Sequence, residues 1–263
     1  MPCTTMSRVL AAAAAVSLAI FAAPGEARAE SKAKSASGKV AWCGEGFEAL
    51  PGDVCHIDGR KPGGERKTLV IWLHGLIGVK TDWSHNHQKM IERVAKYEGV
   101  EVLFPRGVEA QGAYGWPGTV DGQEKVEQSL YEEWMKAKTV LEKRDNKAFD
   151  EVFIFGFSSG AYFTSSLAMR GRFAVDGYAT FAGGQGGMTK ANAAAVDHFA
   201  PTFVGICAQD SQTAQHSRNF AGALAGAGIP WRASEQPVGH GLSEVHFKQA
   251  IAFLRSKKVQ RVG

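Results

Sequence analysis

The stretch EVFIFGFSSGAYFTSSLAMR, residues 151–170, decides the fold of this chain. Its opening run VFIF, residues 152–155, is β-branched and aromatic, which is typical of a buried strand. The next five residues, GFSSG, match the pattern G-x-S-x-G around Ser158, and residues 161–170 are typical of a helix. A strand, a tight turn and a helix form the context in which this serine stands clear of the sheet as a nucleophile. A plain glycine-rich loop is the alternative, because the pentapeptide is short.

A serine hydroxyl is a weak nucleophile until a neighbouring base takes its proton. The motif at Ser158 therefore predicts two partners elsewhere in the chain, a histidine that acts as the base and an acid that orients it.

Composition sets the limits for the rest of the chain. The 263 residues are 44% hydrophobic and 21% charged, which is ordinary for a globular protein. The length suits one large domain or two small ones. The net charge of +4 is not clustered along the sequence, so we expect no nucleic-acid partner.

The N-terminus has the features of an export signal. Residues 9–23 are almost continuously apolar, and Ala27-Arg28-Ala29 offers an A-x-A cleavage site. We expect a signal peptide at 1–29, a flexible leader at 30–38, and a periplasmic or secreted protein. An uncleaved anchor is the alternative, although the apolar run is short for a membrane span. No cysteine stands at the cleavage point, so we expect no lipid anchor. With the short apolar run, this leads us to expect no stable membrane anchor.

Export changes how the cysteines are interpreted. Cys3 would leave with the signal peptide. Cys43 and Cys55 lie close together in a loop-like segment, and an oxidising compartment makes a disulfide between them plausible. Cys207 lies in an apolar run and is expected to be a buried free thiol. With no second cysteine pair, the spacing does not suit a zinc site.

Strands and helices alternate along the rest of the chain. Strands are expected at 40–43, 54–57, 68–73, 99–104, 152–155, 175–181, 202–207 and 231–234, the first two as an edge hairpin. Helices are expected around 90–95, 126–141, 161–170, 189–199, 212–225 and 247–254. This alternation favours βαβ units in a mostly parallel sheet with helices on both faces. We expect one domain over residues 39–263, because the segment 181–202 is too short for a cap domain.

With these elements in place, residues 65–258 resemble the α/β-hydrolase superfamily. Within it the chain is similar to small, lidless secreted esterases: the polyhydroxybutyrate-depolymerase and feruloyl-esterase-like group, near the carboxylesterase and dienelactone-hydrolase groups. The resemblance implies the chain order nucleophile, acid, histidine. It also implies an acyl-enzyme chemistry that needs no cofactor and no metal.

Two residues fit the implied partners of Ser158. Asp210 follows the strand at 202–207, where a strand delivers side chains to the ligand-binding edge of the sheet. Its alternative role is to cap the next helix. His240 lies between glycines in a loop after the last strand, whereas His216 and His246 fall within helices. The expected triad is Ser158, His240 and Asp210.

The resemblance further implies an oxyanion hole built from two backbone N–H groups. One belongs to Ser159, directly after the nucleophile, and the other to the loop His74-Gly75-Leu76, where Leu76 is the expected donor. The HGL sequence departs from the triple-glycine form of this loop, which leaves the second donor uncertain by one residue. His74 is expected to be structural.

Other side chains are candidates for the substrate pocket. Tyr114 and Trp116 lie in a loop at the active edge and could line an acyl or aromatic pocket, or simply pack. Phe157 and Tyr162 flank the nucleophile and are expected in the pocket or the core. His85-Asn86-His87 could suggest a metal, but the alternate spacing puts the two histidines on different faces, so a polar loop is favoured.

The sequence thus predicts an exported serine hydrolase that cleaves carboxylic esters, either small or attached to a polymer, in an open cleft without interfacial activation. A polyester depolymerase, a thioesterase and a peptidase are alternatives that would use the same triad. A non-catalytic binding protein of the same fold is a further alternative, but it would be expected to lack a triad residue.

Overall fold

The computed structural model describes residues 41–63, 66–184 and 199–257. These belong to one compact unit, Lys39–Gly263. The expected signal peptide, the leader and the helix at 189–199 lie outside the described residues, apart from the last residue of that helix. In the described part of the chain, we find no helix with the length and apolar character needed to cross a membrane.

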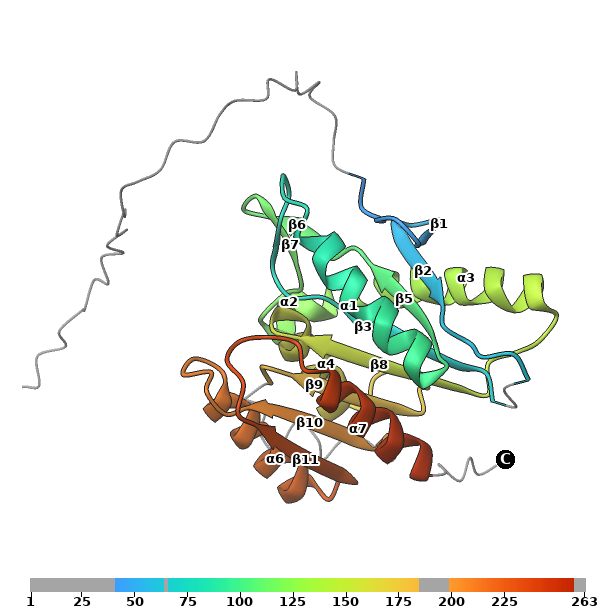
Figure 1. The fold of residues 1–263 in the computed structure, drawn as a ribbon. Helices are drawn as coiled ribbons and strands as arrows, with labels where there is room; N and C mark the ends of the chain where they lie inside the picture. The colour runs from blue at the N-terminus through green and yellow to red at the C-terminus, as the bar shows by residue number, and fades with distance from the viewer. Residues whose placement is uncertain (1–40, 64–65, 185–198, 258–263) are drawn as a thin grey trace, which may run out of the picture. The chain divides into compact units, whose positions relative to one another are not determined.

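A single eight-stranded sheet forms the centre of the unit (Figure 1). In spatial order its strands are β1 (Glu48–Leu50), β2 (Val54–Asp58), β5 (Glu101–Pro105), β3 (Thr68–Leu73), β8 (Glu151–Phe157), β9 (Gly177–Phe181), β10 (Thr202–Cys207) and β11 (Trp231–Gln236). The six strands from β5 to β11 are mutually parallel, and β1 and β2 pair antiparallel at one edge. The predicted mostly parallel sheet is therefore confirmed.

Helices cover both faces of this sheet. One face carries α1 (Trp83–Glu98) and α7 (Glu244–Ser256), which lie in front of the sheet in Figure 1. The other face carries α3 (Glu127–Asp145), α4 (Ser159–Met169) and α6 (Ala214–Ala227). Side chains of β3 alternate between the two layers: Leu69 and Ile71 pack toward α3, α4 and α6, whereas Trp72 packs toward α1 and α7. Such a strand is buried on both faces, which explains its unbroken apolar sequence.

The order of the strands creates a crevice at the carboxyl edge. The chain passes from β3 to β5 on one side and then to β8 on the other side of β3. The loops that follow β3 and β8 therefore diverge at their shared edge, which is where open α/β sheets bind ligands.

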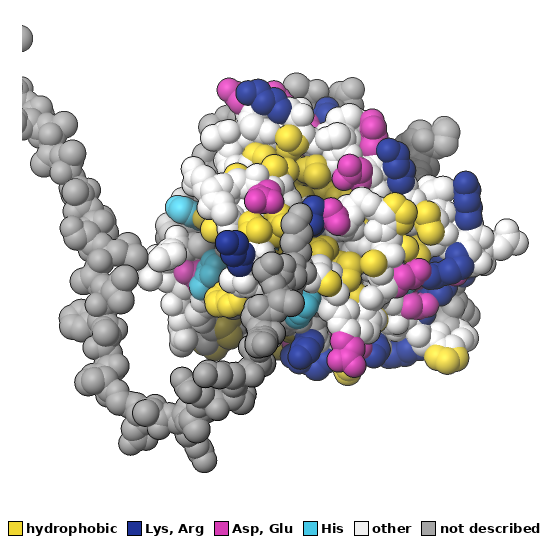
Figure 2. Space-filling model, turned by 90° about the horizontal axis from the view of Figure 1, so that it is seen from above, with side chains coloured by type: hydrophobic (Ala, Val, Ile, Leu, Met, Phe, Trp, Pro, Cys, Tyr) yellow, Lys and Arg dark blue, Asp and Glu magenta, His cyan; other side chains and the backbone are white. Residues whose placement is uncertain are grey.

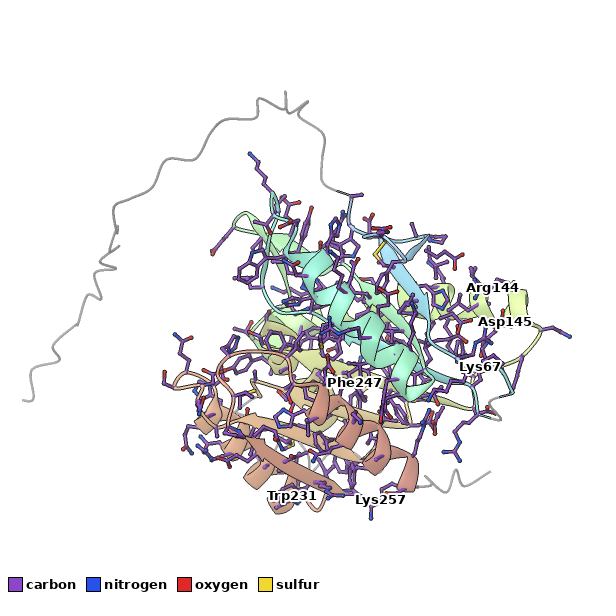
Figure 3. All side chains as sticks on the ribbon, in the orientation of Figure 1. Lys67, Arg144, Asp145, Trp231, Phe247 and Lys257 are labelled. Carbon is purple, nitrogen blue, oxygen red and sulfur yellow. A yellow bond between two sulfur atoms is a disulfide. The ribbon has the colours of Figure 1, made fainter. Side chains whose placement is uncertain are left out.

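The N-terminal hairpin differs from the prediction. It is formed by β1 and β2, and the expected strand at 40–43 is wrong for its described residues, 41–43. The amide of Gln88 on α1 bonds the carbonyl of Trp42 and the N–H of Gly44, so a side chain occupies the backbone groups that a strand would have used. Cys43 is joined to Cys55 of β2 by a disulfide, visible as the yellow bond in Figure 3. Cys207 is a buried free thiol, as expected.

The loop expected around residues 106–117 contains a small sheet of its own. β4 (Ile77–Gly78), β7 (Ala113–Gly115) and β6 (Val108–Ala110) form three short antiparallel strands, followed by α2 (Val120–Glu124). Strands of two or three residues carry no readable alternation, so the sequence pattern did not indicate them. This small sheet ties the loop after β3 to the loop after β5, beside the crevice.

Candidate active site

Ser158 lies on the tight turn between β8 and α4, with φ 52° and ψ −117°. A residue with a side chain rarely adopts a positive φ, and such strain is characteristic of functional turns. The two motif glycines make the turn possible. A Cβ on Gly156 would lie 2.2 Å from the carbonyl oxygen of Gly160, and one on Gly160 would lie 2.1 Å from that of Leu73. The predicted strand, turn and helix around Ser158 are thus present.

Asp210 follows β10 and is almost completely buried. Its carboxylate accepts hydrogen bonds from the N–H groups of Gln212 (3.0 Å) and Thr213 (3.3 Å) and from the Thr213 hydroxyl. Burial by itself raises the pKa of this carboxyl, but the bonds from Thr213 and His240 outweigh burial and lower the pKa. The two expected roles of Asp210 coexist, because one oxygen holds the turn before α6 while the other faces His240.

His240 connects the acid to the serine. It lies in the loop after β11, and its Nδ1 is 2.6 Å from Oδ2 of Asp210. Its Nε2 is 2.9 Å from Oγ of Ser158. The structure therefore brings together all three residues that the sequence nominated, although Ser158 and His240 are 82 positions apart. With Nδ1–H donated to Asp210, Nε2 is left as an acceptor for the serine proton.

The loop after β3 lies against the serine. A Cβ on Gly75 would come within 3.2 Å of the Ser158 Cβ. Within the described residues, the N–H of Leu76 donates no hydrogen bond. The N–H of Ser159 belongs to the first turn of α4, where no helical acceptor exists. The two expected oxyanion donors thus belong to segments that border the nucleophile, the loop after β3 and the start of α4.

His74 is fully buried and organises this loop. Its Nε2 accepts the N–H of Gly107 (2.9 Å), its Nδ1 bonds the carbonyl of Gly75, and its own carbonyl accepts the N–H of Gly160 (3.1 Å). Burial lowers the pKa of His74 to about 3, so the ring is neutral at ordinary pH. Its contacts are structural, in agreement with the expectation.

A pocket of about 380 Å³ opens beside Ser158. Its walls come from the loop after β3, the first half of α1, the nucleophile turn and the loop of His240. The lining residues are Gly75, Leu76, Trp83, Asn86, His87, Met90, Phe157, Ser158, His240, Gly241 and Leu242. Of the side chains predicted for a pocket, Phe157 is present.

Tyr114 and Trp116 do not line this pocket, so packing is the better of their two interpretations. The Trp116 ring is buried and packs against Phe163, and its Nε1–H donates to the His74 carbonyl (2.8 Å). Tyr114 packs against Trp42 at an inter-centroid distance of 5.5 Å. Tyr162, which also flanks the nucleophile, lies outside the pocket lining, and its hydroxyl bonds His216 Nδ1 at 2.6 Å.

The sequence analysis missed the contribution of α1. Residues 85–87 are helical, and the expected polar loop is wrong. His85 and His87 do face different ways: His85 Nε2 bonds the carbonyl of Ala41 (2.8 Å), whereas His87 lines the pocket. The spacing of Trp83, Asn86, His87 and Met90 on one helical stripe was the available signal. A search of the described ranges for three or more metal-binding side chains in one place found no such group.

Comparisons with known proteins show which solved structures this fold resembles. No protein-family model and no curated protein matches the chain. Among solved structures, a carboxylesterase from Mesorhizobium loti is similar, with a TM-score of 0.57 and 16% identity over 81% of this chain and 100% of that one. A Bacillus cereus carboxylesterase gives 0.53 and 16% identity over 77% and 93%. Acyl-protein thioesterase 2 from Zea mays gives 0.50 and 15% identity over 78% and 98%.

Together with the sheet order and the helices on both faces, these likenesses identify the α/β-hydrolase fold.

Proposed function

We propose that this protein is an exported serine hydrolase that cleaves carboxylic esters. The observation that carries the proposal is the continuous hydrogen-bonded chain from Asp210 through His240 to Ser158, with the serine on a strained turn. This arrangement has the geometry of a nucleophile, a general base and an orienting acid.

The reaction would proceed through an acyl-enzyme. Ser158 Oγ attacks the carbonyl carbon of the ester while His240 Nε2 takes the hydroxyl proton. The oxyanion of the tetrahedral intermediate would accept hydrogen bonds from the N–H groups of Leu76 and Ser159, each worth about 3 kcal/mol in the transition state. The intermediate collapses as the bond to the alcohol oxygen breaks and His240 returns the proton to that oxygen. A water molecule then attacks the acyl group, His240 takes its proton, and Ser158 regains its own as the acid leaves.

Asp210 holds the imidazole for both half-reactions. Its lowered pKa keeps it ionised, so it stabilises the charged form of His240 that each proton transfer creates. Hydrogen bonds from the N–H groups of Gln212 and Thr213 hold the Asp210 carboxylate in place. The fixed carboxylate in turn keeps the His240 ring in one orientation.

Export is part of the proposal, with the signal peptide ending at Ala29 and the mature protein in the periplasm or outside the cell. The Cys43–Cys55 disulfide supports it, because structural disulfides persist in oxidising compartments. The proposed substrate is a small or polymer-linked ester, and no nucleic acid, stable membrane anchor or cofactor is involved.

The test is hydrolysis of a chain-length series of p-nitrophenyl esters by the protein and by Ser158→Ala. We expect activity in the protein and its loss in the variant, and the preferred chain length sizes the acyl pocket. Matched thioester and amide substrates separate an esterase from a thioesterase or a peptidase. No hydrolysis of any member of the panel, or equal rates in both proteins, would contradict the proposal.

A further inference from the structure

Besides Ser158 and His240, the pocket has mostly apolar walls with two polar side chains, Asn86 and His87, set among them. Leu76, Trp83, Met90, Phe157 and Leu242 provide the apolar surface. On α1, Trp83, Asn86, His87 and Met90 recur at helical spacing and form a single stripe along one wall. Asn86 is exposed at this wall, whereas His87 is mostly buried within it. A substrate that fills the pocket therefore meets an imidazole among apolar groups.

His87 is held by packing and by no hydrogen bond. Its ring meets the Phe157 ring edge-on, with 5.7 Å between their centroids. Its Nδ1 is buried and has no partner among the described residues, whereas its Nε2 is not among the buried atoms and no described group bonds it. Its neighbours differ: His85 bonds the Ala41 carbonyl, and both ring nitrogens of His74 are bonded.

Because Nδ1 is closed off from solvent, the nitrogen that a substrate in the pocket can meet is Nε2, and no group of the described chain occupies it. A neutral imidazole offers one N–H donor and one acceptor. Burial lowers the pKa of His87, which favours this neutral form. A hydroxyl group can both donate and accept, so it can bond Nε2 in either tautomer of the neutral ring, whereas a carboxylate or an ammonium group fits only one tautomer. An uncharged hydroxyl also costs less than a charged group to bury among apolar walls.

We propose that His87 determines specificity by hydrogen-bonding a hydroxyl group of the substrate, carried on an otherwise apolar chain. This inference rests on the proposed ester hydrolysis at Ser158. The pocket borders both the expected oxyanion loop and His240, which protonates the leaving alcohol, so the hydroxyl group can belong to the acid or to the alcohol. Experiments on each part of the ester distinguish these two sources.

The test uses pairs of esters that differ only by a terminal hydroxyl. One series varies the acid, from p-nitrophenyl butyrate, hexanoate and octanoate to their ω-hydroxy counterparts. The other varies the alcohol, from butyl, hexyl and octyl acetate to the ω-hydroxyalkyl acetates. The readout is the ratio of kcat/KM for the hydroxylated ester to that for the plain ester. Variants are His87→Phe, which keeps a ring, and His87→Gln, which keeps a donor and an acceptor. The control is Lys89→Gln, at an exposed position of α1 outside the pocket lining.

We expect His87→Phe to lower this ratio about five- to hundredfold for at least one chain length. His87→Gln should retain part of the preference, and Lys89→Gln should leave the ratio unchanged. A ratio that is the same in the protein and in His87→Phe for every pair would overturn the proposal. So would an equal effect of Lys89→Gln.

A binding measurement separates this inference from the proposed function. Calorimetry in the Ser158→Ala background compares the affinities of the same hydroxylated and plain esters without turnover. If hydroxylated esters bind better and His87→Phe removes that preference, the inference stands even where no ester is hydrolysed, and only the proposed reaction fails. Equal binding of the two esters with and without the imidazole would refute the role of His87.

Discussion

The polar side chains at the two edges of the central sheet lie in different environments. At the carboxyl edge, Ser158 and His240 are partly open to the pocket and His87 has no hydrogen-bond partner among the described residues. At the amino edge, charged side chains are buried against one another, as at Lys67, Glu101 and Asp145. The carboxyl edge thus presents polar groups to a pocket, whereas the amino edge pairs charges with one another inside the fold.

The amino edge is centred on Lys67, whose side chain is only 1% exposed. Its Nζ lies 2.9 Å from Asp145 Oδ2, 3.8 Å from Glu101 Oε1 and 4.2 Å from the centroid of the Phe149 ring. Lys67, Asp145 and Arg144 lie near one another in Figure 3. Because a buried charge is costly unless it is paired, this ammonium depends on its partners.

The same edge also holds His56 between two carboxylates. Its ring nitrogens lie 2.9 Å from Glu101 and 3.1 Å from Glu48. On the face that Figure 2 shows, acidic and basic side chains are interspersed. Mutations at the two edges should therefore have different effects. Those at the carboxyl edge should lower catalytic activity, and those at the amino edge should lower stability.

The largest expected effect is on catalysis, from Asp210→Asn. The amide would present the wrong group to His240 Nδ1 and favour the unproductive tautomer, so we expect kcat to fall about 10⁴-fold. Steady-state kinetics on a p-nitrophenyl ester measures this loss. Thermal unfolding of the same variant shows whether it is folded. A fall in kcat of less than tenfold in a folded variant would remove Asp210 from the proposed triad.

The counterpart at the amino edge is Lys67→Met. The substitution removes the fully buried cation from Glu101 and Asp145 and leaves them only the more exposed Arg60 and Arg144, so we expect the free energy of unfolding to drop by up to about 3–5 kcal/mol. Denaturant unfolding measures the drop, and Lys136→Met, at an exposed position on α3, is the control, with a change within about 0.5 kcal/mol. The kcat of the folded fraction should stay within about twofold of the original. A loss of activity without a loss of stability in Lys67→Met would contradict the structural role of the amino edge.

The disulfide is expected to have a smaller effect. Cys43 and Cys55 are 12 positions apart, and cross-linking a loop of that length stabilises the fold by about 3 kcal/mol in the chain-entropy model. Reduction of the protein should therefore lower the denaturant midpoint. A variant with both cysteines changed to alanine should start from that lower midpoint and show no response to the reductant. A response of the double variant would point to another target.

The smallest expected effect is a pH dependence at the amino edge. Burial alone would raise the pKa of Asp145, but Lys67, Arg144 and Arg60 outweigh burial and lower it to about 2. A carboxyl with a depressed folded-state pKa stabilises the protein above its unfolded-state value near 4, and this stabilisation is lost as the pH falls toward 2. We expect unfolding free energy to decrease over that window by on the order of 1 kcal/mol from this group. Asp145→Asn should flatten that part of the profile, and an unchanged slope would contradict the assignment.

The fold and the three proposed catalytic residues could be predicted from the sequence because each has a local signal tied to chain order. Ser158 has its pentapeptide between a strand and a helix. Asp210 and His240 each follow a predicted strand, and parallel strands deliver such residues to one edge. These signals can be read from the sequence without knowing how the side chains pack.

The wall of the pocket could not be predicted in the same way. Which face of α1 meets the crevice depends on how that helix is held, and it is held by side-chain bonds of His85 and Gln88 to residues 41–44. No local sequence pattern indicates hydrogen bonds between residues so far apart in the chain, so His87 was assigned to a polar loop. Likewise Trp116 follows a strand end but turns into the core, where its indole bonds the His74 carbonyl.

The most direct test of the account is covalent labelling of the nucleophile. Diethyl p-nitrophenyl phosphate would transfer its diethylphosphoryl group to an activated serine and release p-nitrophenol. The resulting phosphate ester of serine is hydrolysed only slowly, so the label stays on the protein. We expect one p-nitrophenol released per protein molecule, loss of esterase activity, and a single diethylphosphoryl group located by peptide mass spectrometry on Ser158. Ser158→Ala should take up none. Labelling at another residue, or esterase activity that persists in a fully labelled protein, would contradict the assignment of Ser158 as the nucleophile.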